Sequence, residues 1–313
     1  RRNGVFMQVL QNRRQMSRAC RSAKRPLGLV PTMGALHEGH MALVKQARKD
    51  NSTLAATIFV NPSQFGPQED LSAYPRDLER DLALLREEGV DLVFTPSVEE
   101  IYPPGFNTWV DVGGLGDRLE GAHRSGHFRG VATVVAKLFN IIGPDRAYFG
   151  QKDGQQSAVI RKMVRDLDLD VEVVMVPTVR DSDGLALSSR NAYLTEEQRR
   201  AAPVVYRALQ LAQRLWQEGI TDGSWIRSET RLVLESEGLI ERIDYVSVAN
   251  AETLDCLPQL LNTFVDTQLL DTRLSVGIDE TPFSIELPDG RRIEGAVTPS
   301  LRLLETTTEE QEV

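Results

Sequence analysis

The stretch Leu27-Gly28-Leu29-Val30-Pro31-Thr32-Met33-Gly34-Ala35-Leu36-His37-Glu38-Gly39-His40 decides the fold of this chain. Its apolar start, residues 27–30, predicts a short buried strand, and the apolar residues that follow stand at helical spacing: Met41, Leu43, Val44 and Ala47. A strand that turns through glycines into a helix leaves free backbone N–H groups and the positive end of the helix dipole facing the loop. Nucleotide phosphates bind at such a helix start, so the stretch predicts a phosphate-binding loop.

The same stretch holds His37 and His40, two of the four histidines of the chain. Imidazoles in such a turn can donate hydrogen bonds to phosphate oxygens, and a proton when they are charged. A lone histidine is more often structural than functional, but here the strand, the glycines, the spacing and the helix start occur together. A zinc site is a weaker alternative, because His-Glu-Gly-His lacks the i,i+4 spacing of a metalloprotease helix.

Strand-like and helical segments alternate through about the first 180 residues. The predicted strands are 54–60, 91–95, 109–112, 146–149 and 171–176, and the predicted helices are 76–88, 128–142 and 155–167. This alternation predicts an α/β fold, a Rossmann-like doubly wound parallel sheet with helices on both faces. Ligands in such folds bind beyond the carboxyl ends of the strands.

The pattern changes after Arg180-Asp181-Ser182-Asp183-Gly184, which is typical of a hinge. The segments expected beyond it are helices at 195–218, with a capping box at Thr195 and Gln198, and at 225–237, a strand at 243–248, a hairpin at 283–294 turning at Asp289-Gly290, and a disordered acidic end at 305–313. We therefore predict two domains, residues 1–183 and residues 184–313, the second a smaller α+β lid domain.

The composition excludes several classes of protein. The net charge of −9 opposes non-specific binding to nucleic acid, which needs a basic surface. Two cysteines far apart in sequence build no disulfide framework, so a reducing cytosol is the default compartment. No apolar run approaches the roughly 18 residues of a membrane span, and no apolar region follows the basic N-terminus as it does in a signal peptide. We expect a cytoplasmic protein without a nucleic-acid or membrane partner.

Two loops outside the opening stretch carry polar groups with competing explanations. Residues 61–66 form a turn by composition, but Gln64 beside an aromatic residue can hydrogen-bond a small polar substrate against an apolar wall. Residues 118–130 hold the other two histidines and form either a solvated basic loop or a mobile loop that brings Arg124 and Arg129 to an anion. The spacing of the four histidines gives no support to a shared metal site.

Two more loops carry groups that bind anions. After the predicted strand 146–149, Gly150 allows close backbone approach, Lys152 can meet a phosphate, and Asp153 can cap the next helix or bind a ribose hydroxyl. Beyond the hinge, two hydroxyls and a guanidinium form either an ordinary surface loop or a polyphosphate clamp: Ser188, Ser189 and Arg190. Together the loops favour a nucleotide-using enzyme.

Five motifs, taken together in chain order, resemble those of the pantothenate synthetase family of pantoate–β-alanine ligases. Residues 31–40 are similar to the His-x-Gly-His signature of the nucleotidylyltransferase superfamily. The other four resemble this branch alone: Phe59–Phe65, Gly126–Val131, Phe149–Asp153 with Gln155-Gln156, and Leu187–Asn191. The resemblance runs from about Met7 to Leu257, and beyond it only Asp271–Leu274 keeps a trace of the family's usual ending.

The resemblance implies a two-step reaction in a cytoplasmic homodimer that uses ATP and Mg²⁺. ATP and pantoate would give pantoyl adenylate and pyrophosphate, and β-alanine would then displace AMP to form the amide. The residues implied to contact ATP are Met33, Gly34, Ala35, Leu36, His37, Glu38, Gly39, His40, Gly150, Gln151, Lys152, Asp153, Val179, Leu187, Ser188, Ser189 and Arg190. Those implied to act in the chemistry are His40, His37, Lys152 and Arg190.

The substrate contacts expected from the same resemblance are fewer. Pantoate is expected to contact Gln64, Gln156, Asn61 and Arg129, and β-alanine to contact Gln64. No protein ligand is assigned to Mg²⁺, which would bind mainly through the ATP phosphates. Because a carboxylate attacks a phosphate, the site must neutralise charge, and neutral glutamines can orient that carboxylate while leaving it reactive. Closure of the second domain would keep water from the acyl adenylate.

Three alternatives stay open at the level of sequence. Another nucleotidylyltransferase would share the His-x-Gly-His motif, but would not carry the segments 61–65 and 151–156. A fragment of a class I aminoacyl-tRNA synthetase conflicts with the acidic charge and the short length. A nucleotide-binding module without catalysis conflicts with the presence of the four expected catalytic side chains.

Overall fold

The computed structural model describes residues 7–67, 69–258, 281–286 and 292–303, the last two segments by their backbone alone. The chain divides into two compact units, Arg1–Val179 with Leu187–Ser189, and Arg180–Ala186 with Arg190–Val313. The boundary expected between residues 183 and 184 falls inside the segment Arg180–Ala186, and a division at that point stays a prediction.

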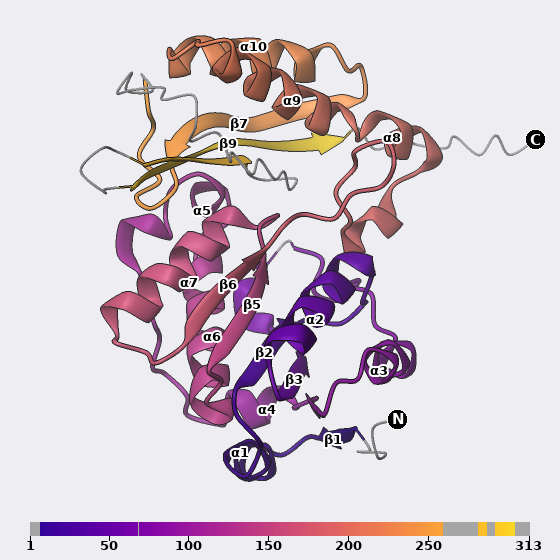
Figure 1. Ribbon diagram of the computed structural model, residues 1–313. Coiled ribbons are helices and arrows are strands. Elements are labelled where there is room, and N and C mark those ends of the chain that lie inside the picture. The colour runs from indigo at the N-terminus through magenta and orange to yellow at the C-terminus, as the bar shows by residue number, and fades with distance from the viewer. Residues whose placement is uncertain (1–6, 68, 259–280, 287–291, 304–313) are drawn as a thin grey trace, which may run out of the picture. The chain divides into compact units, whose positions relative to one another are not determined.

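The first unit is built on a six-stranded sheet in the order β1-β4-β3-β2-β5-β6 (Figure 1). Every neighbouring pair of strands is parallel. The strands are β1 (Gln8–Leu10), β2 (Leu27–Thr32), β3 (Thr53–Ile58), β4 (Leu92–Phe94), β5 (Arg146–Gly150) and β6 (Glu172–Val176). From β2 the chain order runs outward through β3 and β4 on one side and through β5 and β6 on the other, and β1 lies beyond β4. The predicted doubly wound α/β fold is confirmed.

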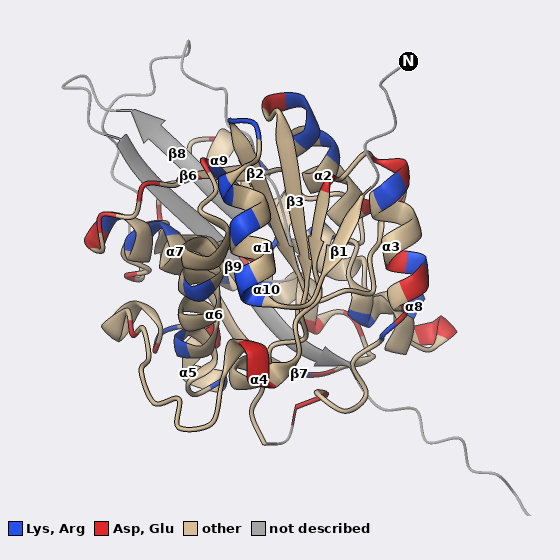
Figure 2. Ribbon diagram, turned by 90° about the horizontal axis from the view of Figure 1, so that it is seen from below, with Lys and Arg blue, Asp and Glu red and all other residues tan. Residues whose placement is uncertain are grey.

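Helices cover both faces of this sheet (Figure 2). The helices are α1 (Arg13–Arg21), α2 (Glu38–Asp50), α3 (Leu78–Glu87), α6 (His127–Ile142) and α7 (Gly154–Asp166). The predicted apolar stripe of α2, which includes Met41 and Val44, is buried against the sheet together with Leu85 of α3. The shorter elements of this unit are η1 (Pro62–Gln64), α4 (Val98–Ile101), η2 (Gly113–Leu115) and α5 (Glu120–His123), and η3 (Ser189–Tyr193) begins in it.

Two sequence predictions of regular structure are wrong. Residues 109–112 form no strand: the Val110 N–H donates to Thr133 Oγ1 (2.9 Å), and the ring of Trp109 stays exposed. The expected long helix 195–218 is two helices, α8 (Glu196–Ala201) and α9 (Val204–Gln217), separated at Pro203, which has no N–H to continue the ladder. The capping box of Thr195 and Gln198 is confirmed at the start of α8.

The second unit is smaller and mixes helices with an antiparallel sheet. Its core joins α9 and α10 (Gly223–Glu235) to β7 (Ile240–Asn250) through buried apolar residues such as Leu209 and Val248. The sheet order is β7-β9-β8, with β8 (Thr281–Glu286) and β9 (Arg292–Leu303) antiparallel, as the predicted hairpin required. The predicted turn at Asp289-Gly290 and the predicted disordered end 305–313 lie outside the described residues.

The helices in the described parts of the chain include none with the length and apolar run needed to cross a membrane.

Replacing Gly184 with alanine is expected to destabilise the second unit. Gly184 has φ +95°, and a Cβ there would overlap the ring of Tyr206, over which the guanidinium of Arg180 stacks at 4.5 Å. Gly219 in the same unit has φ +89° with open space around its Cβ position, so Gly219→Ala is a matched control. Both variants strain the backbone, but overpacking should cost Gly184→Ala about 1–3 kcal/mol more in urea unfolding. Equal losses would contradict this packing role.

Candidate active site

Predicted ligand-binding residues of the first unit lie at one edge of its sheet. The loops that follow β2, β3, β5 and β6 all leave the carboxyl ends of parallel strands, and the register pairs Thr32 with Ile58 and Gly150 with Val176 at those ends. This edge is where α/β sheets bind ligands. The loops expected to hold nucleotide and pantoate therefore begin side by side.

The buried carboxylate of Asp81 holds the loop after β2 through hydrogen bonds. The Oδ2 and Oδ1 atoms of Asp81, on α3, accept hydrogen bonds from the backbone N–H groups of Ala35 and Leu36, both at 2.8 Å. The backbone is left-handed at Gly34 (φ +86°) and Ala35 (φ +50°), so these bonds hold a conformation that the chain does not favour. Burial raises the pKa of Asp81.

Sequence analysis missed Asp81, although one signal was present. Asp81 stands on the face of α3 that its leucines, including Leu85, mark as buried. A charged residue on such a face needs partners inside the protein.

His37 and His40 begin helix α2 with a reciprocal capping box. His37 Nδ1 accepts from the Gly39 N–H (3.1 Å), and His40 Nδ1 accepts from the His37 N–H (3.3 Å). Since Nδ1 accepts in both rings, each neutral imidazole carries its proton on Nε2. Among the described residues neither Nε2 has a hydrogen-bond partner, so both N–H groups are available to a ligand. The ring centroids lie 4.1 Å apart.

The environment keeps both imidazoles neutral. Burial, followed by the charge of Lys152, lowers the pKa of His37 to about 4. Burial, followed by the neighbouring His37, lowers the pKa of His40 to about 3. Without a ligand these rings are therefore hydrogen-bond donors through Nε2 rather than cations.

Lys152 and Asp153, after β5, lie close enough to act electrostatically on both histidines. Lys152 lowers their pKa values and Asp153 raises them. Asp153 stands at the N-cap position of α7, but its side chain makes no capping hydrogen bond; instead it pairs with Lys152 (Nζ–Oδ1 2.9 Å). The expectation that Asp153 caps the helix with its carboxylate is therefore wrong.

Part of the predicted polyphosphate clamp joins the same loop. Ser189 Oγ donates to the Ala35 carbonyl (3.1 Å), and the Leu187 N–H donates to the Val179 carbonyl (3.0 Å). A Cβ added to Gly39 would overlap the ring of His37 and would stand in ordinary contact with Leu187. Arg190 belongs to the second unit and is exposed, so its role at the phosphates stays a prediction.

Gln64 and Asn61, both expected to bind pantoate, have different surroundings. Asn61 is buried, and its Oδ1 accepts from the hydroxyls of Ser63 and Tyr102, both at 2.8 Å. Its Nδ2 donates to Gln64 Oε1 (3.0 Å), which leaves the Gln64 Nε2 donor without a partner among the described residues. Asn61 thus orients the half-buried Gln64 so that its amide N–H groups can serve a ligand.

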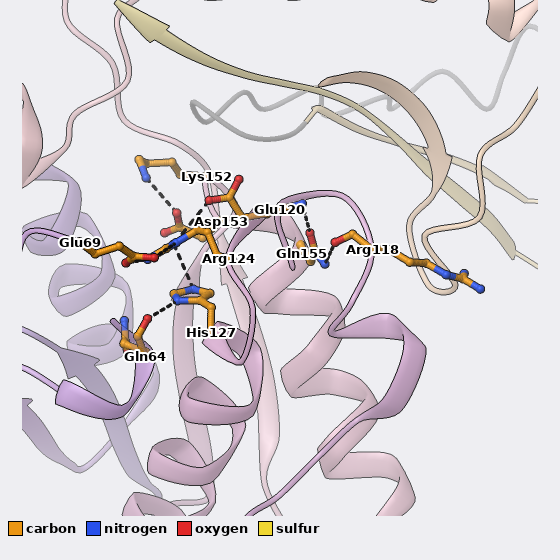
Figure 3. A network of polar contacts seen from close by, with 9 residues as sticks. All are labelled: Gln64, Glu69, Arg118, Glu120, Arg124, His127, Lys152, Asp153 and Gln155. Carbon is orange, nitrogen blue, oxygen red and sulfur yellow. Dashed lines mark hydrogen bonds and ion pairs between the residues drawn. The ribbon is translucent and has the colours of Figure 1, made fainter. Parts of the chain in front are cut away.

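The loop of residues 61–66, called the substrate loop below because Gln64 is expected to bind pantoate, rests on a polar network (Figure 3). Arg124 donates to both carboxylate oxygens of Glu69 (3.0 and 2.6 Å), and its Nη1 lies 3.2 Å from His127 Nε2. His127 Nδ1 lies 2.7 Å from the Gln64 carbonyl oxygen. The charge of Asp153 also acts on His127, so the β5 loop lies near this network. Sequence analysis named Arg124 but missed Glu69 and His127 as parts of the site.

The structure does not bring Arg129 into this network. Its side chain is exposed and its guanidinium lies 5.1 Å from the ring centre of Trp109. Of the two glutamines after β5, Gln155 is buried and spends its amide on the backbone of Leu115, Arg118 and Glu120. The half-buried Gln156 is the one left for a ligand, and its predicted contact with pantoate stays a prediction.

A group of three or more His, Cys, Asp or Glu residues arranged to hold a metal ion is absent from the described residues. The Nδ1 atoms of His37 and His40 each accept a hydrogen bond from a backbone N–H group.

Acidification is expected to weaken the fold through His37, His40 and His127. Burial lowers the pKa of His127 to about 4, as it does for His37, whereas an unfolded histidine titrates near pH 6.5. The unfolded chain therefore binds more protons between these values, and stability present above about pH 6.5 is lost as the pH falls toward 4. Urea midpoints at pH 7 and pH 5 measure this. A shallower pH dependence is expected for His40→Gln, and identical midpoints in the wild type would disprove the burial argument.

The sequence model of the family described as pantoate-beta-alanine ligase matches residues 5–278. The chain belongs to this family. A pantothenate synthetase of Chloroflexus aurantiacus is 61% identical over 237 residues, which cover 76% of this chain and 84% of that protein. One of Herpetosiphon aurantiacus is 54% identical over 264 residues, covering 84% and 94%. The predicted membership of the pantoate–β-alanine ligases is confirmed.

Solved structures of the same ligase family share the fold. The pantothenate synthetase of Thermus thermophilus has a TM-score of 0.79 at 45% identity, covering 93% of this chain and 98% of that one. The pantoate-β-alanine ligase of Francisella tularensis, solved with β-γ ATP and β-alanine, has a TM-score of 0.67 at 29% identity, covering 95% and 98%.

Proposed function

We propose that this chain joins pantoate to β-alanine at the expense of ATP, through a pantoyl adenylate. The observation that carries the proposal lies at the carboxyl ends of the strands. There the β2 loop presents two Nε2–H imidazoles near Lys152, and the β3 loop presents the Nε2 donor of Gln64, which has no partner among the described residues. Family membership and the ligand-bound relative from Francisella tularensis support the choice of substrates.

In the first step a carboxylate oxygen of pantoate attacks the α-phosphorus of ATP, and the bond to pyrophosphate breaks. Negative charge accumulates on the phosphates as the bond changes. We propose that three kinds of group stabilise that charge: the N-terminus of α2, the Nε2–H groups of His37 and His40, and the ammonium of Lys152. No protein nucleophile is required, because the substrate supplies it.

The amides of Gln64 and Gln156 are proposed to hold the pantoate carboxylate. Gln64 Oε1 already accepts a hydrogen bond from Asn61 Nδ2, so Nε2 is the atom available to a ligand. Its N–H groups can donate to a carboxylate oxygen. A neutral donor orients the carboxylate without pairing with its charge, which keeps the oxygen nucleophilic. In the second step the amine of β-alanine attacks the acyl carbon, loses a proton and releases AMP.

Mg²⁺ is proposed to enter with ATP. Mg²⁺ in nucleotide sites is commonly held by substrate phosphates with few protein ligands. Its chemistry would be to neutralise phosphate charge. We assign no residue of the chain to the ion.

Three wider expectations are part of the proposal. Residues 184–313 would act as a lid that keeps water from the adenylate, the enzyme would be a homodimer, and it would work in the cytoplasm where ATP is plentiful. Small-angle scattering with and without ATP and pantoate tests the first, sedimentation velocity tests the second, and fractionation of producing cells tests the third.

The experiment that tests the reaction has two parts. Pantoate-dependent exchange of label between pyrophosphate and ATP measures the first step, and β-alanine-dependent release of AMP measures the second. We expect both. Exchange with a different acid would instead indicate another nucleotidylyltransferase, and ATP binding with neither activity would indicate a module without catalysis.

A further inference from the structure

We propose that His127 is a positioning residue for Gln64, and that the first turn of α6 is the support on which the substrate loop rests. The proposal builds on the function given to Gln64 above. In this proposal His127 does not contact the substrate; it acts through its hydrogen bond to the Gln64 carbonyl.

The partners of His127 fix which ring nitrogen carries the proton. A guanidinium can only donate, so the contact between Arg124 Nη1 and His127 Nε2 (3.2 Å) makes Nε2 the acceptor. The proton of the neutral ring is then on Nδ1, which donates to the Gln64 carbonyl at 2.7 Å. This is the tautomer opposite to that of His37 and His40.

The hydrogen bond from His127 to the Gln64 carbonyl involves a buried ring, so its loss would be costly. His127 is only 8% exposed, and its ring packs edge-on against Phe128 with the centroids 4.8 Å apart. Burial, followed by the Arg124 charge, lowers the pKa of His127 to about 4, so the ring stays neutral and keeps its single Nδ1–H at neutral pH. Loss of this donor would leave the Gln64 carbonyl oxygen unsatisfied inside the protein. Such a loss costs more free energy than the loss of an exposed hydrogen bond.

A second contact, one turn further along α6, holds the other end of the loop. The Gly130 carbonyl accepts from Asn61 Nδ2 (3.3 Å), and a Cβ on Gly130 would overlap the carbonyl oxygen of Ser63. The helix backbone and the loop backbone are thus in direct contact. His127 at one end and Gly130 at the other fix the peptide from which the Gln64 side chain projects.

The support is itself held in place by Glu69. The two-point ion pair of Arg124 with Glu69, joined by Glu120 Oε1 at 3.5 Å, sets the plane of the guanidinium. Glu69, Arg124 and His127 therefore form a chain of hydrogen bonds that ends on Gln64 (Figure 3). Because this chain of hydrogen bonds ends on the substrate loop, its loss should affect the carboxylate substrate more than ATP.

Two isosteric substitutions separate this role from a general packing role. An asparagine amide can occupy the position of Nδ1 and still donate to Gln64, whereas a glutamine amide reaches the position of Nε2, where it meets the donor Arg124. We expect His127→Asn to keep KM for pantoate within about threefold of wild type and His127→Gln to raise it about tenfold, the size of one lost buried hydrogen bond. KM for ATP should stay within about threefold in both.

The measurement independent of activity is the tautomer of the ring. Two-bond ¹H–¹⁵N spectra distinguish Nδ1–H from Nε2–H imidazoles, and the signals are assigned by removing one histidine at a time. We expect Nδ1–H for His127 and Nε2–H for His37 in the same spectrum.

The outcomes separate this proposal from the reaction itself. An Nε2–H tautomer at His127, or equal pantoate KM values for His127→Gln and His127→Asn, would overturn the positioning role even in an active enzyme. If His127→Gln fails to fold, the tautomer of the wild-type protein decides. A wild-type protein without pantoate-dependent exchange would overturn the proposed reaction, while the spectrum would still test the geometry of His127.

Discussion

Replacing His40 with alanine is expected to lower the rate of pantoate-dependent pyrophosphate exchange by about 10²-fold or more, the effect of losing one group that stabilises the transition state. His40 Nδ1 is held by the His37 N–H, so its Nε2–H is fixed in direction before ATP arrives. A preset donor needs no reorganisation when charge develops on the phosphates, and alanine removes it entirely. Single-turnover formation of pantoyl adenylate measures the effect on the chemical step.

Two further variants make the role of His40 specific. His40→Gln places an amide N–H near the position of Nε2 and should retain more activity than His40→Ala, although it loses the capping contact. His123 is exposed at the end of α5 and lies outside the predicted ATP contacts, so His123→Ala should exchange at the wild-type rate. An unchanged single-turnover rate in His40→Ala would defeat the assignment.

Replacing Asp81 with alanine is expected to cause the largest loss of stability. The change leaves the N–H groups of Ala35 and Leu36 without their acceptors, and each orphaned buried donor costs about 1–3 kcal/mol. We expect the free energy of unfolding to fall by about 2–4 kcal/mol. We also expect KM for ATP to rise by about tenfold or more, because the loop proposed to bind phosphate loses its shape. Urea unfolding and exchange kinetics measure the two effects.

A control on the same helix isolates the loop from the helix. Asp77 caps α3 by accepting from the Arg80 N–H (3.1 Å), so Asp77→Ala should cost about 1 kcal/mol without changing KM for ATP. If Asp77→Ala raises KM for ATP as much as Asp81→Ala does, the effect belongs to the helix and the role of Asp81 in the loop is wrong.

Local patterns were sufficient wherever neighbours in sequence decide the structure. The apolar spacing of α2 and the glycine turn before it predicted a strand, a loop and a helix start, because these depend on burial periodicity and on backbone freedom within a few residues. The capping box at Thr195 followed in the same way. The helix break at Pro203 was also local, and it was missed only because the apolar period continues through it.

Long-range partners could not be predicted from such patterns. Asp81 acts on a loop 45 and 46 residues earlier in the chain, and His127 acts on Gln64 across 63 residues. Gln155 shows the converse, since an amide suited to a substrate can instead be committed to backbone groups, whereas the expected contact of Arg129 with pantoate stays a prediction. Which of these happens depends on the packing of distant segments.

The sequence by itself determined the parallel α/β frame, the glycine-containing loop of residues 33–37 between β2 and α2, and the ligase family. These follow from periodicity, glycine positions and motifs that are continuous in the chain. Only the tertiary structure decided that the Nδ1 atoms of His37 and His40 are committed to backbone, that Asp81 holds their loop, and that His127 carries its proton on the other nitrogen. The physical reason is that the direction of a hydrogen bond is set by the partner it meets, and those partners come from elsewhere in the fold.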